Sequence, residues 1–353
     1  MHSGNGNGEH SERFVTRLSP RPVVVASMAP GYGAVFNAGL VHHEGRFHLF
    51  ARAVRSGYRR NPGPGDRFLG YVSDIVVFTS EDGLAYKFGY MLAEAGTDGA
   101  QCLEDPRVQL VDGRYLMTCT WLPPVGSGLP WRIGAHRLVW EHGRFWLDGP
   151  GRLLGPEGVQ DKDAVVFPLP GGRAALVHRV HPDMQLAVFD SLEDLMAPPD
   201  GYWAGYMAGL SSHTLIAPAH GALGVGAGAP PVETADGLLL FFHERRADGS
   251  YTMNVALLDR ATGELLSRLP SAVLEPELEW ERHGDVDNVV FVQGACRQGD
   301  SVYLAYGAAD RCVGAAIASV PDLLGTLAAR MTSPVFGKAQ NGQRKGSPTI
   351  LGL

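Results

Sequence analysis

Cysteine is scarce in this 353-residue chain, which has only Cys102, Cys119, Cys296 and Cys312 and no C-x-x-C pair. Cysteines spaced this widely indicate neither a zinc knot nor a disulfide framework. Basic character is lacking too, because 30 Lys and Arg residues stand against 37 Asp and Glu, which gives a net charge of −7. An acidic balance argues against a nucleic-acid partner, which normally selects a basic face.

Long apolar runs and helical patterns are also few. No stretch is long and apolar enough to span a bilayer, and the first ten residues lack the apolar core of a signal peptide. We therefore expect a cytoplasmic protein with reduced thiols and no membrane partner. The spacing of apolar residues predicts one clear helix over 320–331 and a weaker helical turn over 191–196.

Turn residues and short apolar runs are abundant instead. The chain has 46 Gly and 24 Pro, and its 45% hydrophobic and 19% charged residues are typical of a folded globular protein. Five segments share one pattern, in which a short strand turns on Gly or Asp into a second apolar strand that ends in polar groups. These segments are 36–53, 104–121, 162–179, 228–245 and 287–310.

The repeated hairpin predicts the architecture. Its equivalent positions, Asn37, Asp105, Asp163, Pro230 and Asn288, recur 58 to 68 residues apart. One unit of about four strands repeated five times predicts an all-β, five-bladed β-propeller with a short C-terminal helix. A β-sandwich with coincidental hairpins is the alternative, and the shared phase of the polar residues disfavours it. We expect one propeller domain over 21–331, a flexible tail at 1–20 and a second tail at 332–353.

A propeller would bring the polar ends of these hairpins together, because the first strand of each blade lines the central channel. Four first-strand residues should therefore face one another at one mouth of the channel: Asn37, Asp105, Asp163 and Asn288. The ends of the second strands should lie one layer out: Arg52, His178, Arg179, His243, Glu244 and Asp310. Polar side chains in this phase define a pocket rather than a core.

Asp105 is the candidate acid of this pocket. Glu104 and Asp105 are neighbours in a strand and should point to opposite faces, so that only one looks into the channel. The phase of the repeat selects Asp105, and a half-desolvated carboxyl there could act as a general acid. An Asp that merely caps a strand or pairs with Arg107 is the alternative.

Cations recur at or beside the pocket-facing positions: Arg52, Arg67, Lys162, His178 and Arg179. In an acidic protein such a group indicates an anionic ligand, and Arg suits phosphate because it donates two parallel hydrogen bonds. Solvated or ion-paired surface charges are the alternative for each residue singly. We predict no metal site, because no carboxylate is placed to complete one with the histidines.

Eight short motifs follow one another in a specific order: NAG at 37–39, RFLG at 67–70, EDPR at 104–107, DKDA at 161–164, HR at 178–179, GAGAPP at 226–231, NVVF at 288–291 and YGAAD at 306–310. In this order they resemble glycoside hydrolase family 130, the β-mannoside phosphorylases and related mannosidases. The resemblance implies a five-bladed propeller and the inverting phosphorolysis of a β-1,4-mannosyl sugar or manno-oligosaccharide to α-mannose 1-phosphate. It also implies inorganic phosphate as co-substrate and no cofactor.

The resemblance further implies a role for individual residues. Asp105 matches the general acid, whose proton is thought to pass through a sugar hydroxyl to the glycosidic oxygen. Phosphate would be held by Arg52, Arg67, Lys162, His178 and Arg179. The sugar would be bound by Asn37, Glu104, Arg107, Asp163, His243 and Asp310.

Physical logic agrees with phosphorolysis. An inverting hydrolase needs two carboxyl groups ~6.5–9.5 Å apart, whereas a phosphorylase needs one acid and cations that hold its anionic nucleophile. Two alternatives stay open: an inverting β-mannosidase in which Glu244 or Glu281 activates water, and a non-catalytic glycan-binding propeller. A long basic loop at 55–66 departs from the family pattern and leaves the acceptor sugar open. A homo-oligomer is compatible with all of these features.

Overall fold

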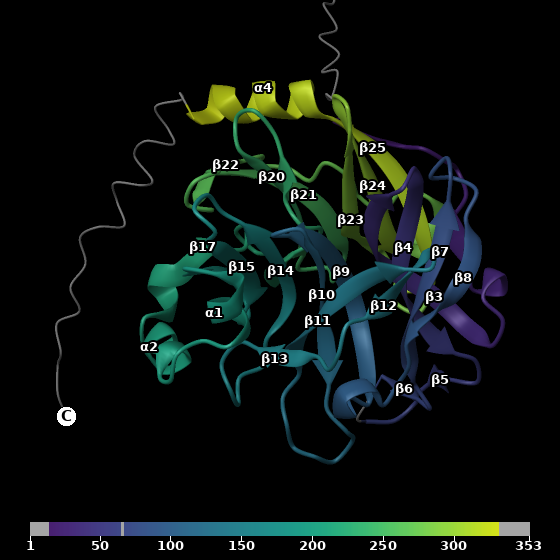
Figure 1. The fold of residues 1–353 in the computed structure, drawn as a ribbon. Coiled ribbons are helices and arrows are strands. Elements are labelled where there is room, and N and C mark those ends of the chain that lie inside the picture. Colours follow the sequence, from purple (N-terminus) through teal and green to yellow (C-terminus); the bar gives the residue numbers. More distant parts are fainter. Residues whose placement is uncertain (1–13, 65–66, 332–353) are drawn as a thin grey trace, which may run out of the picture.

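The computed structural model describes residues 14–64 and 67–331, whose strands form five antiparallel sheets, each with a four-stranded path, around a common centre (Figure 1). This arrangement is a five-bladed β-propeller and confirms the predicted fold class. The helix predicted at 320–331 is α4 (Val320–Met331). The helical turn predicted at 191–196 is α1 (Leu192–Met196), which Ser191 caps by accepting a hydrogen bond from the backbone N–H of Asp194 at 3.0 Å.

The blades follow the chain in order, from the innermost strand outward. Blade 1 consists of β3 (Tyr32–His43), β4 (Arg46–Arg55), β7 (Ser73–Ser80) and β8 (Lys87–Ala93). Blade 2 consists of β9 (Cys102–Val111), β10 (Arg114–Leu122), β11 (Arg132–Glu141) and β12 (Arg144–Leu147), and β13 (Arg152–Leu154) also pairs with β11. Blade 3 consists of β14 (Lys162–Pro168), β15 (Ala174–Arg179), β16 (Met184–Phe189) and β17 (Thr214–Ile216).

Blade 4 consists of β18 (Gly224–Ala227), β20 (Leu238–Arg245), β21 (Tyr251–Leu258) and β22 (Leu265–Arg268), with β19 (Val232–Glu233) beside β20. Blade 5 consists of β23 (Val290–Gln298), β24 (Ser301–Ala308), β25 (Cys312–Ser319) and the N-terminal β1 (Val15–Arg17), and β2 (Val24–Val25) also pairs with β25. The remaining short helices are α2 (Tyr202–Ala208) and α3 (Glu279–Arg282). None of the helices in the described part of the chain is long and apolar enough to cross a bilayer.

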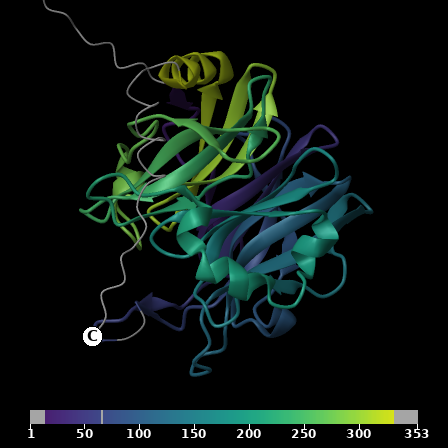
Figure 2. The same ribbon diagram turned by 90° about the vertical axis from the view of Figure 1, so that its left-hand side faces the viewer.

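A separate hairpin, β5 (Arg59–Arg60) and β6 (Phe68–Leu69), forms within the basic loop between β4 and β7. Figures 1 and 2 show it at the bottom of the molecule, whereas α4 lies across the top. The two therefore occupy opposite ends of the propeller.

Close packing of the inner strands depends on small residues. A Cβ atom on Gly39 of β3 would lie 2.5 Å from the carbonyl oxygen of Pro106 in β9.

Between the blades, Leu49 and Phe78 of blade 1 pack with Ala305 and Val313 of blade 5 in one buried cluster. Each large apolar side chain buried in this way contributes about 1.5–3 kcal/mol, so the seams between blades supply much of the stability.

The N-terminal strand closes the ring of blades. Val15 pairs with Ala318 of β25 and is buried, so the predicted tail at 1–20 is wrong where β1 forms. A strand of three residues is too short for its pattern to be distinguished from a tail, and only its pairing with the last blade defines it. The rest of that tail before residue 14, and the predicted tail at 332–353, lie outside the described residues.

Arg17 strengthens this closure through a buried carboxylate. Its Nε and Nη2 each lie 2.8 Å from an oxygen of Glu281, which is fully buried. The same carboxylate accepts hydrogen bonds from Tyr306 Oη at 2.8 Å and from the backbone N–H groups of Glu277 and Leu278. Although burial opposes ionisation, these donors lower the pKa of Glu281 below its ordinary value.

We expect Arg17→Ala to lower the free energy of unfolding by about 3 kcal/mol, because it leaves the buried carboxylate of Glu281 without its cation. Urea denaturation at pH 7 measures this loss. Arg46→Ala is the control, because Arg46 pairs with Glu81 on the surface and should contribute less than about 1 kcal/mol. Equal losses in the two variants would contradict the closing role of Arg17.

Candidate active site

One backbone feature recurs in three inner strands and builds the site. Asn37, Asp105 and Asp163 have φ angles of 47°, 54° and 54°, and each lies where the register shifts between the inner strand and its neighbour. Asn and Asp adopt this left-handed conformation more readily than other residues with a side chain, and bulges of this kind redirect a side chain. The same polar position is thus turned out of the strand in blades 1, 2 and 3.

The bulge at Asp105 overturns one expectation. We expected Glu104 and Asp105 to point to opposite faces, yet both carboxylates contact the guanidinium of Arg52. The simple alternation of a strand fails here because Asp105 and Pro106 together lie opposite the single residue Cys119. Both acidic side chains therefore reach the same site.

Arg52 is the centre of a group that we call the acid cluster: Asn37, Arg52, Glu104, Asp105 and Asp310. Arg52 Nη1 lies 3.2 Å from Asp105 Oδ1, Nη2 donates to Glu104 Oε1, and Asn37 Nδ2 donates to Asp105 Oδ1 at 2.9 Å. The side chains of Arg52, Glu104 and Asp105 are 12, 13 and 9% exposed. They are thus largely desolvated yet still reach solvent.

The cluster changes the titration of two carboxyl groups. Burial raises the pKa of Glu104 to about 7, and the charges of Asp105 and Asp310 add to this effect while Arg52 and Lys162 oppose it. Burial likewise raises the pKa of Asp310 to about 6, against the opposing charge of Arg52. One guanidinium therefore does not keep all the surrounding carboxyls ionised at neutral pH.

A second group surrounds Asp163 in blade 3. Its carboxylate lies 3.2 Å from Arg179 Nη1, 3.3 Å from Arg107 Nη2 and 3.5 Å from His243 Nε2. Burial lowers the pKa of His243 to about 4, so this imidazole is neutral at pH 7. Arg179 is 14% exposed and is the member of this group that reaches solvent.

Arg107 does not have the place predicted for a sugar ligand. It is 1% exposed, and its donors bind the carbonyl oxygens of Asp105, Ala227 and Gly228 at 2.7–3.0 Å in addition to the carboxylate of Asp163. The tetrapeptide at 104–107 could not reveal these partners, because Ala227 and Gly228 lie in blade 4. Arg107 instead joins three blades behind the site.

His178 likewise does not fit the phosphate-binding role that we predicted. Its side chain is fully buried, Nδ1 lies 2.7 Å from Asp161 Oδ2, and Nε2 lies 3.0 Å from Tyr206 Oη. Both ring nitrogens thus have protein partners. The helix α2 carries Tyr206 and Trp203, and both of their rings lie against the imidazole of His178.

Two other predicted phosphate ligands keep their charge available. Arg67 and Lys162 form no ion pair with the described residues, although the charge of Arg67 acts on Asp310 and that of Lys162 acts on Glu104 and Asp163. Lys162 Nζ also lies 5.0 Å from the ring centre of Trp131. Asn288, by contrast, is exposed, and its side chain makes no hydrogen bond with the other first-strand residues in the described part of the chain.

Aromatic residues to which the sequence analysis gave no role contact the acid cluster and the group around Asp163. The guanidinium of Arg52 lies 4.9 Å from the ring centre of Phe36 and 5.2 Å from that of Tyr71. Phe291 packs on the ring of His243 with 4.1 Å between centroids. Phe36 directly precedes the NAG motif and Phe291 is the last residue of the NVVF motif, but nothing in the local pattern distinguishes Tyr71 from a packing residue.

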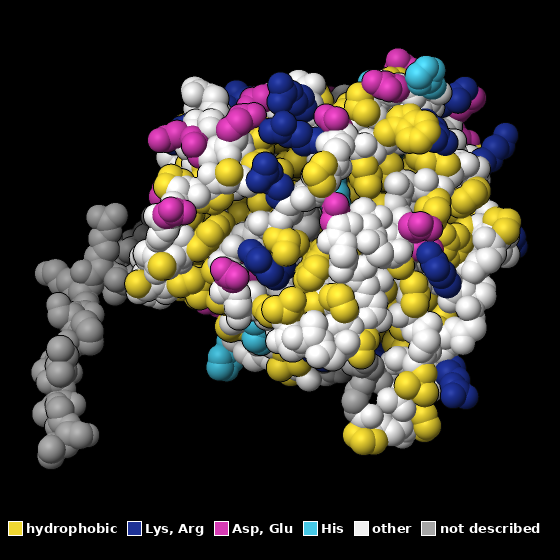
Figure 3. Space-filling view, turned by 60° about the horizontal axis from the view of Figure 1, so that its bottom comes forward, with side chains coloured by type: hydrophobic (Ala, Val, Ile, Leu, Met, Phe, Trp, Pro, Cys, Tyr) yellow, Lys and Arg dark blue, Asp and Glu magenta, His cyan; other side chains and the backbone are white. Residues whose placement is uncertain are grey.

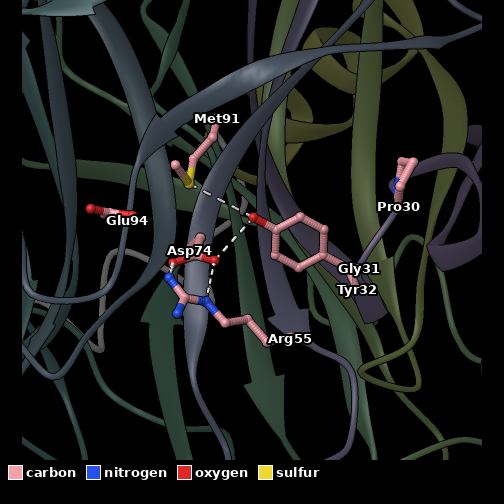
Figure 4. A pocket seen from close by; sticks show the side chains of 7 residues that line it. All are labelled: Pro30, Gly31, Tyr32, Arg55, Asp74, Met91 and Glu94. Atoms are coloured by element: carbon pink, nitrogen blue, oxygen red, sulfur yellow. Dashed lines mark hydrogen bonds and ion pairs between the residues drawn. The ribbon is translucent and has the colours of Figure 1, made fainter.

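Outside these groups, a cavity of about 250 Å³ lies beside Tyr32, Arg55, Asp74, Met91 and Glu94 (Figure 4). Arg55 donates two hydrogen bonds of 2.8 Å to Asp74, and Tyr32 Oη donates a third of 3.0 Å. Asp74 is therefore satisfied within the protein.

On the face at the bottom of Figure 1, Lys and Arg lie in separate groups beside Asp and Glu (Figure 3).

Comparisons with known proteins decide the family. A β-1,2-mannobiose phosphorylase of Thermoanaerobacter sp. (strain X514) is 31% identical over 322 residues, which cover 86% of this chain and 96% of that protein. The chain belongs to glycoside hydrolase family 130. A model of this family, described as β-1,4-mannooligosaccharide phosphorylase, matches residues 157–328. The predicted enzyme class, a glycoside phosphorylase, is thereby confirmed.

Other family 130 relatives agree in fold and length. A 1,2-β-oligomannan phosphorylase of the same Thermoanaerobacter strain is 29% identical, with 87% of this chain and 98% of that protein covered. The solved β-1,2-mannobiose phosphorylase of Listeria innocua superposes with a TM-score of 0.71 at 20% identity, over 89% of this chain and 99% of that one. The latter supports the propeller fold alone.

We expect Glu104→Gln to change how stability depends on pH. The folded pKa of about 7 lies above the ordinary value of 4.5, so the folded protein holds the extra proton and loses stability as pH rises between these values. As the pH rises from 5 to 8, the free energy of unfolding of the variant should therefore increase relative to that of the wild type by about 1 kcal/mol or more. Urea denaturation at both pH values measures this difference. If the difference in the free energy of unfolding between variant and wild type does not change with pH, the raised pKa of Glu104 is contradicted. Glu81→Gln, at an exposed position, is the control.

Proposed function

We propose that this protein cleaves a β-mannoside by inverting phosphorolysis and releases α-mannose 1-phosphate. The observation that carries the proposal is a nearly desolvated carboxyl, Asp105, held with Arg52 and Glu104 in one cluster. Two further cations, Arg67 and Lys162, act on the neighbouring Asp310 and Glu104 and form no ion pair with the described residues. A phosphorylase needs one acid and a cationic place for its nucleophile. The curated relatives of family 130 described above are named as phosphorylases.

Asp105 has a free oxygen for the acid step. Arg52 and Asn37 both bind Oδ1, whereas no described residue donates a hydrogen bond to Oδ2. In the proposed reaction a phosphate oxygen bonds to the anomeric carbon from the α face, and the bond from this carbon to the glycosidic oxygen breaks. The proton from Asp105 goes to the departing oxygen, directly or through a sugar hydroxyl, so that the products are α-mannose 1-phosphate and the acceptor sugar.

The cations would hold the phosphate against the surrounding carboxylates. Lys162 and Arg67 are free of ion pairs with the described residues, and Arg52 separates Asp105 from Glu104. Partial protonation of Glu104, whose pKa is raised to about 7, removes negative charge that would repel the phosphate. The same geometry supports sugar contacts by Asn37 and Asp310, which remain proposals.

The two bases that we considered for the hydrolytic alternative are not placed to activate water beside Asp105. Glu281 is fully buried and bound by Arg17 and Tyr306, so it is not available to activate water. Glu244 follows His243 in β20 and therefore points to the face away from Asp163, where it accepts a hydrogen bond from the N–H of Ala219 at 3.2 Å. Neither of the two residues that we considered for this role adjoins the acid cluster.

The first substrates to test are β-1,2-linked mannosides, since the relatives that are 29% and 31% identical are named for this linkage. The β-1,4 linkage predicted from the sequence is the second candidate, supported by the family description and by a 24% identical phosphorylase of Ruminococcus albus. The cytoplasmic location and a homo-oligomer stay predictions.

We expect the wild type to release α-mannose 1-phosphate from β-1,2-mannobiose only when phosphate is present. Asp105→Asn should lower kcat at least ~10³-fold, because it removes the proton donor, and should change mannobiose binding by less than threefold. Asp322→Asn, at an exposed position of helix α4, is the control and should retain full activity. Free mannose formed without phosphate would favour the hydrolase, and binding without any turnover would favour a glycan-binding propeller.

A further inference from the structure

The basic loop that leaves blade 1 is tied to blade 5 by one residue, Asp285. Tyr58 Oη donates to Asp285 Oδ2, and Arg60 Nη2 donates to the carbonyl oxygen of Asp285 at 2.7 Å. Tyr58 and Arg60 belong to the hairpin segment, whereas Asp285 lies between α3 and β23, more than 220 residues further along the chain. The hairpin is therefore not a free extension of blade 1.

The contacts of Asp285 and Tyr58 also reach the acid cluster through blade 5. Arg311 Nη1 lies 3.0 Å from Tyr58 Oη and 3.2 Å from Asp285 Oδ1. Arg311 directly follows Asp310, and the charge of Asp285 acts on the carboxyl of Asp310. Burial and the neighbouring Asp285 raise the pKa of Tyr58 to about 12, so its hydroxyl remains a donor.

The tie also reaches the acid cluster on the side of blade 1. The ring of Tyr58 packs against those of Phe68 and Tyr71, with centroids 5.6 and 5.5 Å apart. Tyr71 in turn lies against the guanidinium of Arg52, which binds Asp105. Two routes from Asp285 thus end at Arg52 and at Asp310, which are both members of the acid cluster.

We propose that Asp285 is a positioning residue of the active site, which holds the β5–β6 hairpin against blade 5 and thereby fixes Arg52 and Asp310 around Asp105. The inference rests on the proposed function for its kinetic readout. An isolated exposed ion pair would contribute almost nothing. This one is part of a network with two arginines and a tyrosine, and the side chain of Asp285 is only 16% exposed.

The test compares Asp285→Asn and Tyr58→Phe with the wild type in phosphorolysis of β-1,2-mannobiose. We expect kcat/KM to fall about tenfold in both and the acidic limb of the pH profile to move by at least ~0.5 pH unit, because Arg52 and Asp310 set the environment of the acid. Asp285→Glu, which keeps the charge, should recover at least threefold. Glu233→Gln, which breaks a surface pair with Arg260 in blade 4, should have no effect.

Hydrogen exchange of the amides at 56–60 and 67–71 shows whether the hairpin has been released. Faster exchange in Asp285→Asn, with unchanged kcat/KM and pH profile, would overturn the positioning role. If the wild type phosphorolyses no β-mannoside, the proposed function fails. Titration of mannose into the wild type and into Asp285→Asn then decides the positioning role. Binding weakened at least fivefold in Asp285→Asn would support that role, and equal binding would overturn it.

Discussion

The contact between Arg52 and the carboxyls of Glu104 and Asp105 is the constraint on which the site depends. A single guanidinium from blade 1 contacts two acidic side chains from blade 2, and each of the three side chains is only 9–13% exposed. Charges desolvated to this degree are costly unless they are paired. Burial raises the pKa of Glu104 and Asp310, and the charge of Arg52 opposes this rise, so the position of Arg52 bears on the protonation of its neighbours. The aromatic rings that contact Arg52 thereby belong to the candidate site.

Two carboxyls of this protein show how their surroundings decide their use. Glu281 has donors from Arg17, Tyr306 and two backbone N–H groups, and its pKa is lowered. Glu104 shares its one arginine with Asp105, and its pKa is raised to about 7. Both are adjacent to Arg, yet the first is a fixed structural anion and the second can exchange a proton near neutrality.

Repetition of one backbone device explains how distant segments form a common site. The left-handed bulges at Asn37, Asp105 and Asp163 occupy the same place in successive blades, and glycines make room for the redirected side chains. A Cβ atom on Gly307 would lie 1.9 Å from Asn37 Oδ1, and one on Gly226 would lie 2.6 Å from Asp163 Oδ2. The candidate site is thus a consequence of the propeller repeat and of its breaks in regular strand geometry.

The hairpin repeat and its polar phase were sufficient to predict the five blades and the convergence of Asn37, Arg52 and Asp105, and the spacing of apolar residues predicted the helix α4, because these are periodic properties of the chain. The sequence alone could not determine that Glu104 also turns toward Arg52, since a bulge is a relation between two paired strands. Nor could it show that Arg107 and His178 are enclosed, because their partners come from blade 4 and from α2. The contacts of Tyr71 and Asp285 were likewise decided only by tertiary structure, which joins residues whose local patterns carry no sign of each other.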